Sequence, residues 1–201
     1  KMSDVKINTP EKDYEVTVEK SVKKVWPYTA CAIVKNLKFD DEKIKEIIDI
    51  QEKLTNSIGR KRKKLGLGIY PLDKIKMPIT YKAEDPSKIK FRPLEFPREI
   101  TGKQILSQHP TGREYGDLLK EWEVYPIFED SNSNVLSMPP IINSHQTGRI
   151  TEETTEIFVE CTGKNLEFIK TALNIMVSAL SEMGGKVYAI KIKDRKEGTF
   201  T

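Results

Sequence analysis

Only two stretches of this chain combine the length and the apolar periodicity that predict a long helix, and many short strand-like runs lie between them. The first covers residues 40–59 and begins at Asp40 or Asp41, either of which can cap a helix. The second covers residues 165–184 and begins at Asn165. Because helical and strand-like segments do not alternate in regular βαβ units, we expect an α+β fold in which mixed β-sheets form a layered sandwich with packed helices.

Apolar residues repeat at helical spacing in both stretches and define the faces that we expect to be buried. They are Ile44, Ile47, Ile48, Leu54 and Ile58 in the first stretch, and Leu166, Ile169, Leu173, Met176, Val177 and Leu180 in the second. Gln51 falls on the apolar stripe of the first helix. Because a polar side chain on a buried face needs a hydrogen-bond partner, we expect one for Gln51.

Short apolar or alternating runs between turn residues predict the strands. They cover residues 14–18, 28–37, 65–70, 80–82, 90–92, 124–128, 135–138, 155–162 and 186–192. The polar turn at residues 130–134 predicts a hairpin. We expect residues 14–18 at a sheet edge, or in a linker pinned to the sheet, and residues 186–192 to close the sheet. Two short helices are predicted at residues 102–108 and 112–122.

The two ends of the chain indicate a piece of a longer protein. The sequence opens with Lys1 before Met2, which is not a natural start. We expect residues 1–24 to be a linker or edge strand from a preceding domain, residues 25–193 to be one domain, and residues 194–201 to lead into a following domain. A hydrophobic fraction of 37% with 32% charged residues is typical of a soluble globular protein. No apolar run is long enough to cross a membrane.

The residues that usually carry metal or nucleophilic chemistry are few. His109 and His145 are the only histidines, and no Cys/His spacing matches a zinc site, so no metal is expected. Cys31 and Cys161 lie in apolar runs and are interpreted as small buried residues in a reducing compartment. The chain lacks a Gly-x-Ser-x-Gly nucleophile elbow.

Two further motifs have a structural and a functional interpretation. The glycines of Leu65-Gly66-Leu67-Gly68 lack the spacing of a phosphate loop, and a strand with close backbone neighbours explains them more simply. The basic run at residues 60–64 follows the first helix directly. It is either a solvated turn that complements the helix dipole or a contact for nucleic-acid phosphates, and one run alone does not separate the two.

Several motifs, in order and at suitable spacing over about residues 14–192, resemble the editing domain of the phenylalanyl-tRNA synthetase beta subunit of archaeal and eukaryotic type. They are Pro27-Tyr28-Thr29-Ala30-Cys31-Ala32, Asn36-Leu37-Lys38-Phe39, Gln51-Glu52-Lys53-Leu54, Gly59-Arg60-Lys61-Arg62-Lys63-Lys64, Tyr70-Pro71-Leu72-Asp73, Phe91-Arg92-Pro93-Leu94, Val135-Leu136-Ser137-Met138-Pro139-Pro140-Ile141-Ile142-Asn143, Arg149-Ile150-Thr151 and Glu160-Cys161-Thr162-Gly163. The resemblance implies that domain's fold and its activity, the hydrolysis of tyrosine wrongly attached to phenylalanine tRNA.

The resemblance also implies which residues recognise tyrosine. Hydroxyl recognition maps to Ser137, Glu160 and Thr162, because a carboxylate or hydroxyl can pair with a phenol and a plain benzyl ring leaves it unpaired. An aliphatic wall maps to position 128, where this chain carries the bulkier Phe128.

The reacting ester is expected near Gln51, Glu52, Arg62 and Asn143. By the same resemblance, Asn143 donates to the developing oxyanion or positions the attacking water, and Gln51 orients that water. Arg62 neutralises growing negative charge or holds a terminal phosphate. Glu52 serves as general base or binds the substrate ammonium. An ester is already activated, so positioned water and electrostatics suffice without a nucleophile.

Leu94 and Arg149 are expected to pack on and bind the terminal adenosine of the tRNA. The partners implied are the 3′ end of tRNA(Phe) and the synthetase alpha subunit in an alpha2-beta2 heterotetramer, in the cytoplasm. No cofactor is expected in this domain, since ATP and Mg²⁺ belong to the synthetic site of the full enzyme. A non-catalytic tRNA-binding module and a structural domain that holds the subunits together remain alternatives.

Overall fold

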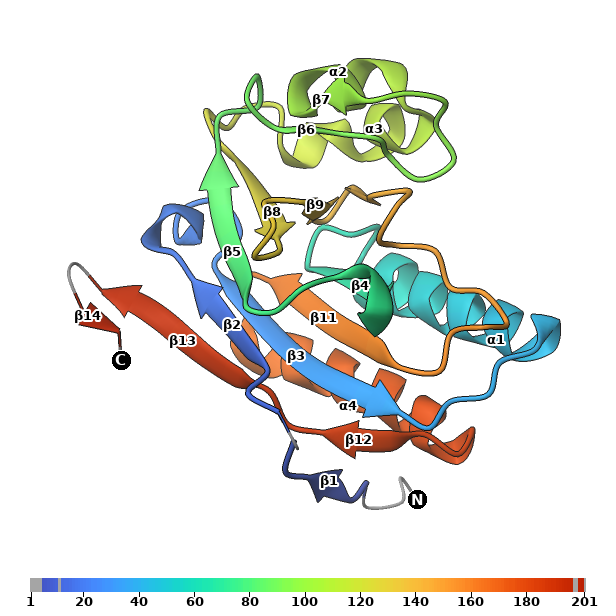
Figure 1. Ribbon diagram of the computed structural model, residues 1–201. Helices are drawn as coiled ribbons and strands as arrows, with labels where there is room; N and C mark the ends of the chain where they lie inside the picture. Colours follow the sequence, from blue (N-terminus) through green and yellow to red (C-terminus); the bar gives the residue numbers. More distant parts are fainter. Residues whose placement is uncertain (1–4, 11, 197–198, 201) are drawn as a thin grey trace.

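Two stacked β-sheets, with two long helices on the outer face of one, form the body of the molecule (Figure 1). The computed structural model describes residues 5–10, 12–196 and 199–200, with side chains to residue 194. A smaller layer of short helices lies beyond the second sheet (Figure 1). The expected α+β fold with mixed sheets and packed helices is confirmed.

The first sheet has five strands and carries the longest ones. Its order is β1 (Ile7–Asn8), β12 (Lys186–Tyr188), β3 (Tyr28–Lys35), β11 (Ile157–Gly163) and β4 (Leu65–Pro71). Strand β11 pairs antiparallel with both neighbours, and Glu160 stands opposite Cys31 on one side and Gly68 on the other.

The second sheet has seven strands and is mixed. Its order is β10 (Ile142–Asn143), β9 (Val135–Met138), β8 (Tyr125–Glu129), β5 (Ile79–Glu84), β2 (Glu15–Val18), β13 (Lys191–Lys196) and β14 (Thr199–Phe200). The predicted hairpin is confirmed as β8 and β9, which pair with a bulge between Phe128 and Glu129. A separate ribbon pairs β6 (Lys90–Phe91) with β7 (Ile100–Thr101).

Both long helices form where they were predicted. The first is α1 (Asp41–Lys53), which Asp40 caps by accepting from the Lys43 amide, and it continues into a π-helical turn, η2 (Leu54–Ile58). The second is α4 (Leu166–Glu182), capped by the side chain of Asn165. The shorter helices are η1 (Lys20–Val22), η3 (Leu72–Lys74), α2 (Gly102–Gln108), α3 (Pro110–Tyr115) and η4 (Gly116–Leu118).

Alternation along the first sheet divides the apolar side chains into two cores. On one face, Val34, Ile69 and Val159 pack with helices α1 and α4. On the other face, Tyr70 and Phe158 pack against the second sheet. The period of two in a buried strand therefore places alternate residues of β4 and β11 between the two sheets.

Three sequence expectations about the elements are wrong in detail. Residues 186–192 contain parts of two strands, since β12 lies between β1 and β3 in the first sheet and β13 joins the second sheet. Residues 14–18 contain β2, which is a strand but lies between β5 and β13 rather than at an edge. The helix expected at residues 112–122 begins at Pro110 and ends with η4 at Leu118.

The predicted inward face of α1 is also wrong in part. Ile47 and Leu54 are buried, but Ile48 and Ile58 are exposed. Ile58 ends a π-helical turn, in which a wider repeat replaces the spacing of 3.6 residues and rotates later side chains off the buried stripe. In α4, Leu166 at the first turn is exposed, whereas the other predicted positions are buried.

Candidate active site

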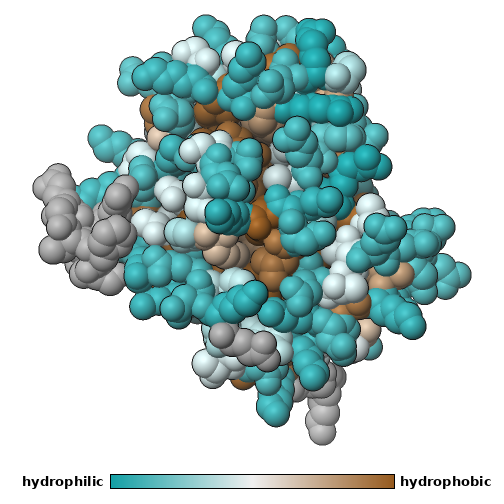
Figure 2. All heavy atoms as spheres, viewed as in Figure 1, coloured by the Kyte–Doolittle hydropathy of each residue, from teal (hydrophilic) through white to brown (hydrophobic). Residues whose placement is uncertain are grey.

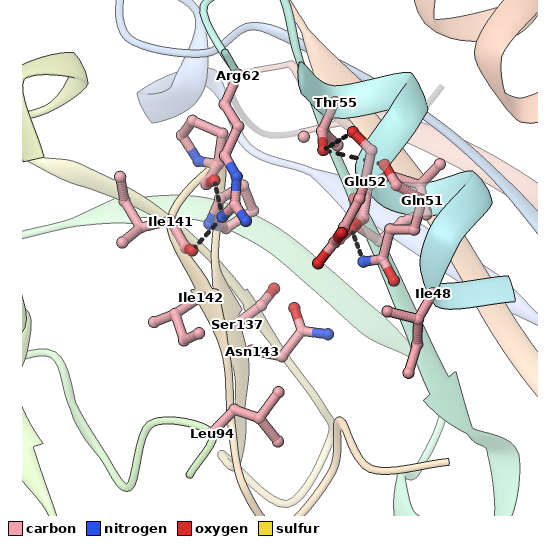
Figure 3. A pocket seen from close by; sticks show the side chains of 15 residues that line it. Ile48, Gln51, Glu52, Thr55, Arg62, Leu94, Ser137, Ile141, Ile142 and Asn143 are labelled. Atoms are coloured by element: carbon pink, nitrogen blue, oxygen red, sulfur yellow. Dashed lines mark hydrogen bonds between the residues drawn. The ribbon is translucent and has the colours of Figure 1, made fainter. Parts of the chain in front are cut away.

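A cavity of about 150 Å³ lies where α1 and η2 meet both sheets (Figure 3). Its walls come from helix residues Ile48, Gln51, Glu52 and Thr55, from first-sheet residues Gly66, Leu67 and Glu160, and from Arg62, Leu94, Ser137, Pro139, Pro140, Ile141, Ile142 and Asn143. Charged and polar side chains cover most of the face in Figure 2, and apolar atoms show along a hollow through its middle. The residues that line the cavity therefore come from parts of the chain between positions 48 and 160 that are far apart in sequence.

All four residues expected near the ester line this cavity. Gln51 donates from Nε2 to the carbonyl oxygen of Leu67 at 2.7 Å, so the expected partner of this inward polar side chain is confirmed. Glu52 is exposed at the open side of the cavity. Asn143 and Ser137 extend toward them from the second sheet (Figure 3).

Arg62 is held over the cavity by a tight turn after the π-helical segment. Arg60, Lys61 and Arg62 all have positive φ, between 49° and 63°, and the Arg62 amide donates back to the Thr55 carbonyl at 2.9 Å. The guanidinium Nη1 donates to the carbonyl oxygens of Ile141 at 2.6 Å and Pro140 at 3.2 Å. Burial lowers the pKa of Arg62 from its ordinary value.

The ring of Tyr115 lies under the Arg62 guanidinium, 4.3 Å from its carbon to the ring centroid. Within the described part of the chain, Arg62 Nε is buried with no hydrogen-bond partner. The planar guanidinium is therefore held by two carbonyl oxygens and by the Tyr115 ring, and its Nε remains a buried donor without a partner among the described residues.

Asn143 is positioned by backbone pairing. It stands opposite Ser137 in the β9–β10 ladder, and its carbonyl oxygen accepts from the Leu94 amide at 2.9 Å. A Cβ added at Gly148 would lie 2.6 Å from the Asn143 Cβ and 3.2 Å from its Nδ2. The glycine at position 148 leaves room for this amide side chain.

Behind the inner end of the cavity lies a buried hydroxyl that was not among the expected site residues. The hydroxyl of Tyr70 lies 2.7 Å from Ser137 Oγ, 2.9 Å from Glu160 Oε1 and 3.4 Å from Asn143 Oδ1. Tyr70 is fully buried and stacks on Phe158. The alternation of residues 65–70 contained a usable signal, because it places Tyr70 on the same face as Gly66 and Gly68.

Glu160 is a buried carboxyl with one satisfied oxygen. Among the described residues, its Oε2 has no hydrogen-bond partner, whereas Oε1 pairs with Tyr70. Burial raises the pKa of Glu160 to about 8, although the bond from Tyr70 acts in the opposite direction. A buried oxygen left open on a cavity wall is suited to receive a polar group of a ligand.

Two of the four residues expected to recognise tyrosine do not line the cavity. Thr162 follows Glu160 on the same face of β11, but its hydroxyl accepts from Trp26 Nε1 at 2.8 Å. Phe128 is fully buried and stacks on Tyr81 with ring centroids 4.6 Å apart. Ser137 and Glu160 are thus the two that the fold brings to the cavity surface.

Of the two glycines of β4, Gly66 lines the cavity, and Gly68 lies behind the cavity wall against Glu160 and Tyr70. A Cβ at Gly66 would lie 3.1 Å from Pro140 and from Thr162 Oγ1, and one at Gly68 would lie 2.2 Å from Glu160 Oε1. The interpretation of these glycines as positions of close approach is therefore confirmed.

Leu94 lines the cavity, but Arg149 does not. Arg149 is exposed on a neighbouring loop, where its Nη1 is 3.4 Å from His145 Nε2 and its Nε is 3.9 Å from Glu95 Oε1. Since Leu94 and Glu95 are adjacent, the two residues expected at the tRNA adenosine flank the same part of the surface.

The remaining candidates for other chemistry lie elsewhere. Cys161 is buried in the core under the helices, and Cys31 is partly buried between the sheets. No group of three or more His, Cys, Asp or Glu side chains that could hold a metal occurs in the described ranges. No helix in those ranges is long and apolar enough to span a bilayer.

Comparison with known proteins gives a consistent result. The beta subunit of phenylalanine–tRNA ligase from Thermococcus sibiricus is 47% identical over 182 residues, which cover 90% of this chain and 32% of that protein. Its counterpart from Methanosphaera stadtmanae is 42% identical over 180 residues, again covering 90% of this chain and 32% of that protein. The chain therefore spans about a third of the length of these relatives. No family model matches it.

A solved structure extends the agreement to the fold. The crystal structure of an N-terminal fragment of the phenylalanyl-tRNA synthetase beta subunit from Pyrococcus horikoshii superposes with a TM-score of 0.90 at 41% identity. The match covers 98% of this chain and 56% of that fragment. In sequence and in fold, this chain belongs to the family of phenylalanine–tRNA ligase beta subunits.

Proposed function

We propose that this chain hydrolyses the ester of tyrosyl-tRNA(Phe), as the editing part of a phenylalanine–tRNA ligase. The observation that carries the proposal is one cavity with two unlike ends. Ser137 and Glu160 offer buried polar atoms at the inner end, and Gln51, Glu52, Arg62 and Asn143 surround the outer end.

The need for such a site follows from the chemistry of the two amino acids. Phenylalanine and tyrosine differ by one hydroxyl, and an apolar synthetic pocket rejects an added hydroxyl only by roughly a hundredfold. A second site can demand that hydroxyl. Glu160 Oε2, buried and unpaired within the described chain, stays without a partner when a plain benzyl ring occupies the cavity.

The proposed reaction is addition of water to the ester carbonyl carbon. The water oxygen forms a bond to that carbon, the carbon–oxygen bond to the ribose breaks, and a proton passes to the ribose oxygen. The Asn143 side-chain amide donates to the developing oxyanion or holds the water, and Gln51 orients the water. Glu52, at the solvent side, accepts the water proton or binds the substrate ammonium.

The rest of the tRNA end extends over the outer rim in this proposal. Leu94 packs against the terminal adenosine, and the exposed Arg149 beside it binds that nucleotide. Arg62 balances negative charge near the ester. In this proposal the chain is part of a cytoplasmic ligase that also has an alpha subunit and uses ATP and Mg²⁺ at its synthetic site. The chain spans about a third of the length of the beta subunits that it matches.

One observation favours a second candidate, a tRNA-binding module without turnover. Lys63 and Lys64 lie beside Lys164 around a surface hollow, and the Lys64 ammonium is 5.5 Å from the Phe168 ring centroid. Cations around a partly buried aromatic ring suit a nucleic-acid backbone and its bases. A structural domain without RNA contact has no use for this cluster.

The test is single-turnover deacylation of tyrosyl-tRNA(Phe) and phenylalanyl-tRNA(Phe) by the chain. We expect the tyrosyl ester to be hydrolysed and the phenylalanyl ester to be spared. Tight binding of both tRNAs without deacylation above the buffer rate would favour the binding module instead. An Asn143→Ala variant that binds the tRNA normally but does not hydrolyse it would separate the two candidates.

A further inference from the structure

The Tyr70 hydroxyl occupies the junction between the two ends of the cavity. It is within hydrogen-bonding distance of Ser137 and Glu160 at the inner end and 3.4 Å from Asn143 Oδ1 toward the outer end. The proposed roles of Gln51, Glu52, Arg62 and Asn143 do not involve it. Tyr70 is nevertheless the one described side chain whose hydrogen bonds reach all three of these residues.

Tyr70 is fixed in this position by its surroundings. It lies in the fully buried strand β4, it is 0% exposed, and its ring stacks on Phe158 with centroids 5.7 Å apart. Gly68 provides the space for its hydroxyl, since a Cβ there would lie 2.4 Å from it. Because the ring is fully buried and does not line the cavity, we expect it to keep this position when a ligand enters.

One hydroxyl carries one proton, and this limits what each neighbour has left for a ligand. Tyr70 pairs with Glu160 Oε1 and leaves Oε2 as the buried atom without a partner in the described chain. Ser137 is held to the same hydroxyl at 2.7 Å. The arrangement presents a single oriented carboxyl oxygen instead of a carboxyl group that is free to rotate.

We propose that Tyr70 is the positioning residue that gives the cavity its preference for a hydroxylated aromatic side chain, by holding Glu160 so that one oxygen faces the ligand. The inference rests on the proposed function for its substrate, a tyrosyl ester. It adds a specificity-determining residue that acts through Glu160 and Ser137 and touches no reacting atom.

Tyr70→Phe is the variant that tests the inference, because it removes the hydroxyl and keeps the packed ring. Tyr81→Phe is the matched control. Tyr81 is equally buried, and its hydroxyl donates to the Trp26 carbonyl outside the cavity wall. Both variants lose one buried hydrogen bond, so a general loss of stability affects both.

The measurement is the affinity of the folded chain for two non-hydrolysable adenosine analogues, 3′-tyrosylamino and 3′-phenylalanylamino, by titration calorimetry. We expect the wild type and Tyr81→Phe to prefer the tyrosyl analogue, and Tyr70→Phe to lose about tenfold of that preference. Thermal melts of each variant establish that it is folded.

The outcomes separate the inference from the proposed function. An undiminished preference in Tyr70→Phe overturns the role of Tyr70 and leaves the editing proposal intact. Equal affinity of the wild type for both analogues overturns the specificity of the proposed function, and the inference with it. Equal losses in Tyr70→Phe and Tyr81→Phe assign the effect to packing and also overturn the role of Tyr70.

Discussion

The inner and outer ends of the cavity are built by different means. At the inner end, Ser137 and Glu160, with Tyr70 behind them, are at most 2% exposed and belong to strands of two sheets. At the outer end, Glu52 is exposed, and Arg62 follows a π-helical turn with positive-φ residues. A buried carboxyl discriminates strongly because water cannot replace a missing partner, whereas hydrolysis needs a side that water and a nucleotide can reach.

The largest effect is expected from Asn143, at the outer end of the cavity. Asn143→Ala removes the side-chain amide that we propose donates to the oxyanion or holds the water, and it should lower the rate of tyrosyl-tRNA deacylation by about 10²–10³-fold. Asn132→Ala, in the exposed turn between β8 and β9, is the control and should leave the rate unchanged. An Asn143→Ala rate within threefold of wild type would remove this residue from the mechanism.

The buried state of Glu160 should make stability depend on pH. With a folded pKa raised to about 8, the folded chain retains a proton that the unfolded chain releases above its ordinary pKa of 4.5. This contribution to stability is therefore full below pH 4.5 and is lost as the pH rises to 8, by an amount on the order of a few kcal/mol.

Thermal melts at several pH values check this dependence. The melting temperature of the wild type should fall between pH 5 and pH 8 relative to that of Glu160→Gln, which cannot ionise. Parallel curves for the two proteins would mean that the inner end is more hydrated than its burial indicates.

The tight packing around Gly68, behind the inner end, gives a third way to test the difference between the two ends. Gly68→Ala places a methyl group against Glu160 and Tyr70 and should destabilise the fold by about 2 kcal/mol, measured by urea unfolding. Gly116→Ala is the control, because an added Cβ there meets its nearest neighbours only at 3.4 Å or more. Similar stabilities of both variants would show that the Glu160 and Tyr70 side chains can shift to make room for the methyl group.

The smallest effect is expected at the rim. Arg62→Ala should reduce kcat/KM for tyrosyl-tRNA by about tenfold, since a charge-assisted hydrogen bond is lost at a half-buried site. Lys61 also has a positive φ but is exposed, so Lys61→Ala is the control and should change kcat/KM by less than twofold. Equal effects would assign Arg62 to general attraction of RNA.

Periodicity predicted which side chains share a face, but not which neighbours they meet. The stripe that contains Gln51 correctly indicated an inward polar group with a partner. The same reasoning failed for Ile48 and Ile58, because a cavity and a π-helical turn interrupt the buried face.

The fold class followed from the order of the elements, whereas strand pairing did not. Residues 186–192 read as one alternating strand, and nothing in their pattern reveals the change of sheet between β12 and β13. Tyr70 was overlooked because an aromatic residue in a buried strand is normally core. Only the three-dimensional proximity of β4, β9 and β11 gives its hydroxyl polar neighbours.

The short step from β12 to β13 carries the chain out of one sheet and into the other. Because Glu160 belongs to the first sheet and Ser137 to the second, this continuous segment ties together the two halves of the ligand cavity. Slow amide protons in β11 and β9 should consequently exchange with one common opening free energy, so that the cavity either exists whole or is lost in the same cooperative event.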